Sequence, residues 1–220
     1  LSARELFAIS PIGLIGTFLI GIWGSAFWGM GPTFGQMIDM STEEIAAFMA
    51  AVMIGAAIGQ WPIGWLSDLM DRRIVLAGGT SVAATSAIGV FVAEAHNILF
   101  LCAVLYGATS ITMYSICIAH VNDRVSQTKL LAAASGLLIS YGAGSTFGPI
   151  LAGSLMDLFG ADALFIGSAT VQAIFAIFVC WRIRVEAAVP KAEKEGFVAM
   201  PSAATSHVGV EVNRHTSSRE

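Results

Sequence analysis

The sequence predicts an all-α membrane protein with six transmembrane helices. Hydrophobic residues make up 56% of the 220 residues and charged residues only 12%, whereas roughly a quarter of a typical soluble domain is charged. The mean hydropathy of +0.77 also indicates a membrane protein. A helix needs about 20 mostly apolar residues to cross the hydrocarbon core of a bilayer. The stretches that meet this requirement are residues 8–35, 45–66, 74–94, 98–120, 130–155 and 163–181.

These apolar stretches predict helices rather than strands. Their apolar runs are continuous, and a transmembrane β-barrel would instead show alternation along short segments. The first stretch, preceded by Arg4, is too long for a signal peptide, has no small-x-small cleavage site, and is followed by five further predicted spans. Because the sequence begins at Leu1 rather than Met, we expect a fragment or a processed piece.

The basic residues predict the orientation of the chain. All eleven Lys and Arg residues precede the first predicted span or follow the second, fourth and sixth. The positive-inside rule therefore places both termini in the cytoplasm. The composition turns polar after Arg184, so we expect a six-helix bundle over residues 1–185 and a mostly disordered cytoplasmic tail over 186–220. No surface for nucleic acid is predicted.

Small residues recur along several predicted spans and indicate close packing of helices. The second span carries a GxxxG pair, and the fifth carries glycines at intervals of four followed by a proline, which predicts both tight packing and a bend. Gly31, Pro32 and Gly35 predict a weakened outer end of the first span. The residues predicted to serve packing or bending are Gly55, Gly59, Gly144, Gly148 and Pro149.

A polar and aromatic face on the fourth predicted span is the best candidate for a solute cavity. Tyr106, Ser110 and Tyr114 are spaced at i, i+4 and i+8 and so share one face. Polar residues inside a membrane tend to face a cavity, although interhelical hydrogen bonds are an alternative explanation. Trp23 and Trp28 could instead lie at the membrane interface, where tryptophan is common. Gln60 could instead form a hydrogen bond between packed helices. The predicted cavity residues are Trp23, Trp28, Gln60, Tyr106, Ser110, Tyr114, Ser140 and Tyr141.

The sixth predicted span differs from the others. Phe165, Phe175, Phe178 and Trp181 project around it, and Gln172 is its one strongly polar residue. This composition favours an outer helix that faces lipid.

The sequence contains no pattern typical of an enzyme. No predicted span holds an Asp, Glu, Lys or Arg near its middle, and there is no HExxH, P-loop or paired carboxylate. Cys102, Cys117 and Cys180 show no metal-ligand spacing and favour apolar packing. We therefore expect no enzyme activity, no cofactor and no metal, and any proton-coupling group would lie outside this chain.

The link between the second and third predicted spans carries a recognisable motif. Over Gly64–Arg73 it resembles the loop pattern Gly-x-Leu-Ala/Ser-Asp-x-x-Gly-Arg-Arg/Lys of the major facilitator superfamily of secondary transporters. The matching positions are Gly64, Leu66, Ser67, Asp68, Arg72 and Arg73. Asp71 replaces the usual glycine, which often supplies a positive φ, and Leu69 replaces a common basic residue.

This resemblance implies a fold, a function and a partner. The family has twelve spans in two six-helix halves, each built from inverted three-helix repeats, and the degenerate motif suits the C-terminal half. We therefore expect a permease or exporter that moves a small solute across a bacterial inner (plasma) membrane by alternating access, in contact with an N-terminal half. Gly64, Asp68, Arg72 and Arg73 would form the gating loop, with Asp68 capping or pairing with a helix of that half.

The Gly144-to-Gly153 segment also resembles a Gly-Pro motif of the antiporter branches. The alternative to a transporter is a six-helix membrane scaffold or sensor that acts through its cytoplasmic tail.

Overall fold

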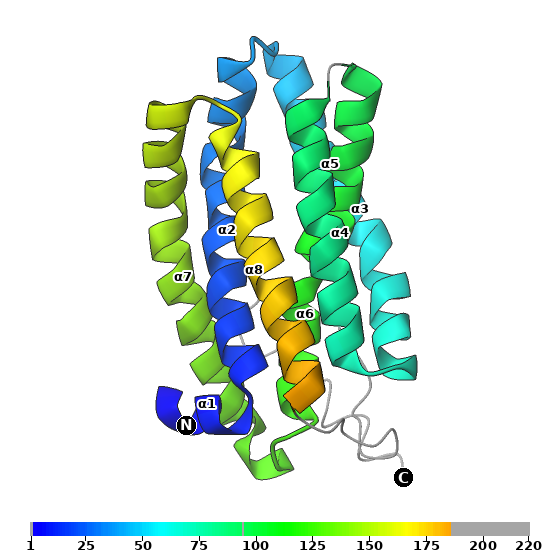
Figure 1. Ribbon diagram of the computed structural model, residues 1–220, viewed down its shortest axis with the longest axis vertical. Helices are drawn as coiled ribbons and strands as arrows, with labels where there is room; N and C mark the ends of the chain where they lie inside the picture. The colour runs from blue at the N-terminus through cyan, green and yellow to red at the C-terminus, as the bar shows by residue number, and fades with distance from the viewer. Residues whose placement is uncertain (1, 94, 186–220) are drawn as a thin grey trace.

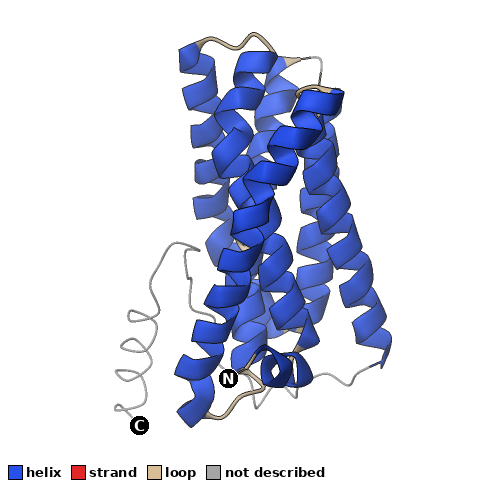
Figure 2. Cartoon of the chain, turned by 90° about the vertical axis from the view of Figure 1, so that its left-hand side faces the viewer, coloured by secondary structure: helices blue, strands red, loops and turns tan. Residues whose placement is uncertain are grey.

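The computed structural model describes residues 2–93 and 95–185, which form an all-helical bundle (Figures 1 and 2). Within these described residues, six stretches are long and apolar enough to cross a membrane, which confirms the predicted number of spans. The predicted tail at 186–220 lies outside the described residues. The elements are α1 (Ala3–Ile9), α2 (Pro11–Met37), α3 (Thr42–Leu69), α4 (Arg72–Val92), α5 (His96–Ser110), α6 (Met113–Asn122), η1 (Gln127–Lys129), α7 (Leu130–Phe159) and α8 (Ala163–Val185).

The first span begins later and ends later than predicted. Ser10, at φ −150°, ends α1 and caps α2 by accepting a hydrogen bond from the Gly13 amide, and Pro11 then occupies the first helical position. The far end of the first span does not unwind, because α2 stays helical through Met37 with Pro32 inside it. Gly35 instead lets α2 approach Ile45 of α3.

The fourth span consists of two helices rather than one. Residues 111 and 112 form a turn between α5 and α6. The Thr109 and Thr112 hydroxyls donate to the carbonyl oxygens of Leu105 and Ala108 at 2.8 and 2.7 Å. Such back-bonding competes with the helical ladder and often bends it.

Helices α2 and α7 pack against each other at very short range. A Cβ atom on Gly144 would clash with the backbone carbonyl of Phe18, and one on Gly21 would clash with that of Tyr141. The contact therefore requires glycine on both helices.

The same contact recurs, in the same register, between α3 and α5. A Cβ atom on Gly55 would clash with the Val104 carbonyl, and one on Gly107 would clash with the Val52 carbonyl. In both helix pairs the two clashing sites lie three residues apart on each helix. The α2–α7 and α3–α5 pairs therefore pack in the same way, and α4 and α8 pack side by side (Figure 1).

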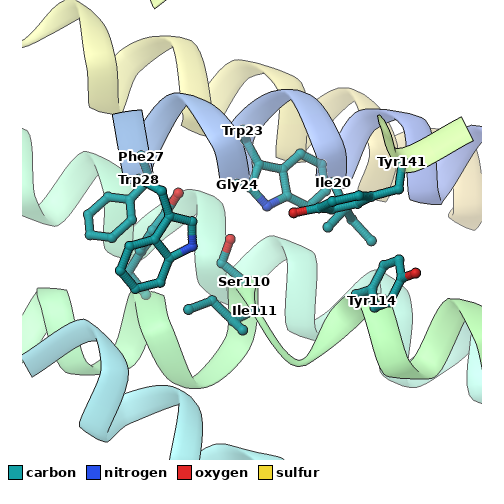
Figure 3. A pocket seen from close by; sticks show the side chains of 10 residues that line it. Ile20, Trp23, Gly24, Phe27, Trp28, Ser110, Ile111, Tyr114 and Tyr141 are labelled. Carbon is teal, nitrogen blue, oxygen red and sulfur yellow. The ribbon is translucent and has the colours of Figure 1, made fainter. Parts of the chain in front are cut away.

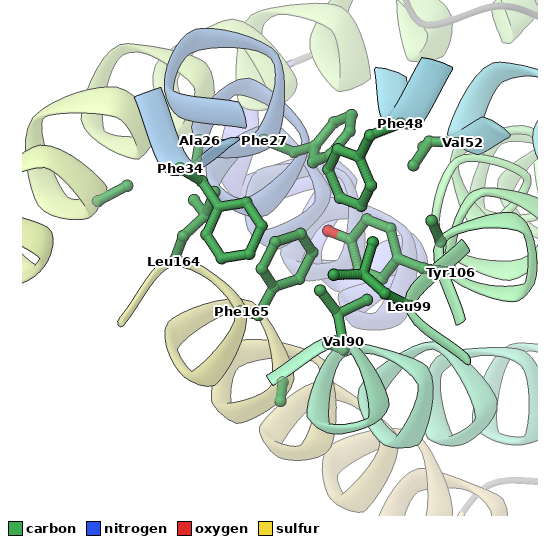
Figure 4. Packing of buried hydrophobic residues seen from close by; sticks show 14 of the residues in the cluster. Ala26, Phe27, Phe34, Phe48, Val52, Val90, Leu99, Tyr106, Leu164 and Phe165 are labelled. Carbon is green, nitrogen blue, oxygen red and sulfur yellow. The ribbon is translucent and has the colours of Figure 1, made fainter. Parts of the chain in front are cut away.

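An aromatic core fills the bundle between α2, α3, α5 and α8 (Figure 4). Phe165 of α8 packs edge-on against Phe34 with ring centroids 4.8 Å apart, and it also contacts Phe48 at 6.1 Å. Phe165 is 1% exposed and Phe175 is fully buried, so the prediction that these phenylalanines face lipid was wrong. Lipid tails are as apolar as a protein core, and apolar spacing alone therefore does not separate the two environments.

The spans are buried to different degrees. Over the apolar part of each span, α7 has 17% of its residues buried and α3 has 28%, whereas α4 and α8 have 50% each. Large apolar side chains such as Trp61 on α3 and Ile139 on α7 are more than two-thirds exposed. Helices α3 and α7 thus carry extensive apolar surface that this bundle leaves uncovered.

The basic residues of the described chain gather at one end of the bundle. Figure 1 shows α1, the α3–α4 turn, the α6–α7 connection and the end of α8 at this common end. These segments carry Arg4, Arg72, Arg73, Arg124, Lys129, Arg182 and Arg184. We refer to it below as the basic end.

Candidate functional site

Helices α2, α5, α6 and α7 and the α5–α6 turn line a shallow recess that is open on one side (Figure 3). It contains six of the eight predicted cavity residues, and Gln60 and Ser140 lie elsewhere. The lining residues are Ile20, Trp23, Gly24, Phe27, Trp28, Tyr106, Ser110, Ile111, Tyr114 and Tyr141. The four lining residues that the sequence did not predict carry no polar side-chain atom to single them out: Ile20, Gly24, Phe27 and Ile111.

Aromatic rings make up most of the wall. Tyr114 and Tyr141 meet edge to face with centroids 5.1 Å apart, and Phe27 and Trp28 do so at 5.2 Å. Trp23 is 2% exposed, whereas Trp28 at the open side is 40% exposed. Edge-to-face pairs hold rings in fixed orientations, so the recess has a defined shape.

Tyr106 has two roles in the structure. Its ring lines the recess, and its hydroxyl lies 2.8 Å from the Ser168 hydroxyl of α8. Gln172 Nε2 donates to the same Ser168 oxygen at 3.0 Å. The sequence left two roles open for Tyr106, a place in the recess wall and an interhelical hydrogen bond. The structure shows both.

The two predicted cavity residues that lie outside the recess have other positions. Ser140 donates a hydrogen bond across the helix pair to the Leu14 carbonyl at 2.9 Å, so it joins α7 to α2. Gln60 is half-buried on α3 and does not line the recess.

The recess carries no formal charge. None of the residues that line it is Asp, Glu, Lys, Arg or His. A second pocket of about 450 Å³ lies between α2, α7 and α8, and its lining is almost entirely apolar. Trp23 lines both pockets and so forms part of the wall between them.

The α3–α4 turn places Asp71 where the motif usually has glycine. Asp71 has φ −59° and caps α4 by accepting a hydrogen bond from the Arg73 amide at 3.0 Å. No positive φ is needed at this position, so aspartate fits where the motif usually has glycine. Asp71 also pairs with Arg73, whose Nη2 lies 2.7 Å from Oδ2.

The ionisation of Asp71 reflects this contact. Burial raises the pKa of the carboxyl group, but the hydrogen bonds from the Arg73 side chain and amide, together with the Arg73 charge, outweigh burial. The net pKa of Asp71 is lower than its ordinary value.

Arg72 links the turn to α6. Its Nε and Nη2 donate to the two carboxylate oxygens of Asp123 at 2.7 and 3.2 Å. Both side chains are 1% exposed. Nη1 of Arg72 also donates to Ser67 at 3.0 Å and to Asp68 at 3.1 Å. Asp68 itself is 38% exposed at the basic end.

The packing glycines lie at helix contacts, as predicted. Gly55 and Gly59 face the backbone of α5, and Gly144 and Gly148 face the backbone of α2. Pro149 lies inside α7, where its ring packs near Gly29 of α2.

Comparison with known proteins places these features in a family. The profile of the Major Facilitator Superfamily matches residues 13–214. The uncharacterized MFS-type transporter YcaD of Escherichia fergusonii is 30% identical over 168 residues, which cover 76% of this chain and 43% of YcaD. YcaD of Escherichia coli O17:K52:H18 is 31% identical over 169 residues, with the same coverage. This chain thus spans less than half of the length of these relatives.

A solved structure confirms the fold. The crystal structure of the human organic anion transporter MFSD10 (TETRAN) matches 91% of this chain and 51% of that protein, with a TM-score of 0.60 and 18% sequence identity. The likeness at this identity concerns the fold alone. The profile match and the bundle of six spans lead to one conclusion, which the Gly64–Arg73 loop had already indicated: this chain belongs to the Major Facilitator Superfamily, a family of transporters and not of enzymes.

Proposed function

We propose that the protein is a secondary active transporter that moves a small solute by alternating access, and that the recess is one wall of its solute cavity. The observation that carries this proposal is the convergence of aromatic and hydroxyl side chains from α2, α5, α6 and α7 on a single recess. The recess lies within predicted membrane spans of a chain that belongs to a transporter family. Transporters of this kind bind solute near the middle of the bilayer, between two structural repeats.

The described helices are proposed to be the C-terminal half of a twelve-helix protein. The 43% coverage of the YcaD relatives supports a longer protein, as do the uncovered apolar faces of α3 and α7, and the degenerate loop motif favours the C-terminal half. An N-terminal six-helix half would cover part of these faces, and lipid would cover the rest.

The basic end is proposed to face the cytoplasm, following the positive-inside rule. The bacterial relatives favour the inner (plasma) membrane as the location. In this orientation the loop of Gly64, Asp68, Arg72 and Arg73 is a cytoplasmic gate. Asp68, which is 38% exposed and pairs with Arg72, is proposed to contact the other half when that gate closes.

Transport can be tested before any substrate is known. Inside-out membrane vesicles from cells that express the full protein would be incubated with an extract of small molecules, and accumulated or depleted solutes would be identified by mass spectrometry. We expect at least one solute to differ from vesicles without the protein. Trp28→Ala should abolish that difference, whereas Trp181→Ala, which changes a similarly exposed tryptophan outside the recess, should preserve it. The absence of any protein-dependent solute would contradict the proposal.

A further inference from the structure

The side chains of the recess restrict the chemistry of the solute. This inference rests on the proposed function, because it treats the recess as the wall that the solute contacts. Three properties of the described side chains matter: the absence of charge, the abundance of rings and the two indole N–H groups.

The first property is the absence of charge. Among the residues that the structure describes, no acidic, basic or histidine side chain lines the recess. A buried ion without an opposite charge is costly, and several kcal/mol per ion is a representative penalty. This wall therefore favours a solute, or a part of a solute, that has no formal charge.

The second property is the ring content. Six of the ten lining residues are Trp, Tyr or Phe. Their rings offer faces and edges to a flat, polarisable partner, and aromatic pairs stabilise contacts beyond the area that they bury. Trp28 lines the recess and is 40% exposed, so part of this residue is left uncovered by the bundle.

The third property is a set of hydrogen-bond donors turned toward the same space. Figure 3 shows the indole nitrogens of Trp23 and Trp28 and the hydroxyls of Ser110 and Tyr141 facing the region between α2 and the α5–α6 segment. Within the described part of the chain, neither indole N–H has a hydrogen-bond partner. An indole N–H is a donor only, so it can be satisfied by water or by an acceptor atom of the solute.

From these properties we propose that the transported solute is a planar, uncharged aromatic molecule with at least one hydrogen-bond acceptor, such as a carbonyl oxygen. Its ring stacks in the recess near Trp28. Its acceptor binds the N–H of Trp23 or Trp28. A ring without an acceptor would leave these donors unsatisfied once it displaced water, and an ion would lack a counter-charge in this wall.

A series of naphthalene derivatives tests each part of this inference. The full protein in lipid nanodiscs would be titrated with naphthamide, methylnaphthalene, naphthoate and aminomethylnaphthalene, and bound ligand would be measured at equilibrium. All four share one ring system, so their differences report on the acceptor and on the charge. We expect naphthamide to bind at least five-fold more tightly than methylnaphthalene, as one hydrogen bond allows. We expect the anion and the cation to bind more weakly than naphthamide.

Two variants connect this selectivity to named atoms. Trp28→Phe keeps an aromatic ring at the partly exposed position but removes its N–H, and Trp23→Phe does the same at the buried position. At least one of them should reduce the preference for naphthamide over methylnaphthalene about five-fold. This ratio cancels any loss of stacking area common to both ligands. Trp181→Phe, on α8 and outside the recess, is the matched control and should leave the ratio unchanged.

The outcomes separate this inference from the proposed function. Equal or tighter binding of naphthoate or aminomethylnaphthalene would overturn the inference, as would equal binding of methylnaphthalene or no binding of the series. A preference that both tryptophan variants retain would also overturn it. If the vesicle assay identifies a transported solute that is charged or lacks a ring, the inference fails and the proposed function stands. If no solute is transported, the proposed function fails as well.

Discussion

The guanidinium group of Arg72 and the carboxylate of Asp123 form a two-point ion pair that ties the start of α4 to the end of α6 at the basic end. The two donor–acceptor distances are 2.7 and 3.2 Å, and each side chain is 1% exposed. A bidentate arginine–carboxylate pair fixes geometry as well as charge. The pair therefore joins the start of the third span to the end of the fourth through a contact that is shielded from water.

Breaking this pair on one side should destabilise the protein. Asp123→Asn leaves a buried guanidinium without its main counter-charge. Such a change typically lowers the free energy of unfolding by roughly 3–5 kcal/mol. Because Arg72 keeps its contact with Asp68, we expect a loss of stability near the lower end of this range. Thermal unfolding in detergent, followed by size-exclusion chromatography, measures the effect. Lys129→Gln, at an exposed site of the same end, is the control. The double variant Arg72→Met with Asp123→Leu should recover most of the stability, because it leaves no buried charge unpaired. If Asp123→Asn is as stable as wild type, the ion pair does not stabilise the fold.

The close contact of α2 and α7 should depend on Gly144. Gly144→Val places a branched side chain against the Phe18 backbone, which cannot move away without separating the helices. We expect a strong decrease in the yield of monodisperse protein. Gly142→Val on the same helix is the matched control, because a Cβ atom at Gly142 meets nothing within 4 Å. Equal yields from the two variants would show that the helices do not pack as described.

The Asp71 carboxylate should stabilise the turn only while it is ionised. Its pKa is lower in the folded protein than its ordinary value, so folding favours the charged form. The stabilisation is therefore complete above the unfolded pKa of about 3.9, and it disappears as the pH falls through the lower folded pKa. The difference in melting temperature between wild type and Asp71→Asn should be constant from about pH 8 to pH 5 and should shrink below about pH 4. A difference independent of pH would show that the carboxylate charge plays no part.

Asp68 should matter for transport more than for folding. Its side chain is 38% exposed and contacts Arg72, which keeps Asp123 as its main partner. Asp68→Asn should therefore lower the transport rate of a solute identified in vesicles while leaving expression nearly unchanged. Asp157→Asn, an exposed acid at the far end of α7, is the control and should transport normally. Unchanged transport by Asp68→Asn would exclude a gating role.

The sequence predicted the features that depend on local composition. The number of spans follows from continuous apolar length, and the packing glycines follow from their regular spacing, because both properties can be read within one helix. The grouping of Trp23, Tyr106 and Tyr141 was also predictable in part. Large polar aromatics deep in a span have few environments that satisfy them.

The features that the sequence did not predict depend on contacts between distant segments. Tyr106 and Ser168 are 62 residues apart, and nothing local to either residue indicates the other. The residues around Phe165 in the sequence are apolar, and an apolar segment suits both lipid and the protein core. The sequence alone therefore does not show which of the two Phe165 faces. Asp71 departs from the family motif, and only the backbone conformation shows that its carboxylate caps α4 and holds Arg73.

The most direct test of alternating access is the labelling of a single cysteine in the recess. In a variant whose Cys102, Cys117 and Cys180 are replaced by alanine, Ser110→Cys would be treated with a membrane-impermeant maleimide in right-side-out and in inside-out vesicles. Ser81→Cys, exposed on α4 and outside the recess, is the control and should react from neither side. The proposed mechanism predicts that Ser110→Cys reacts from both sides of the membrane. Labelling from one side only, or from neither, would contradict it.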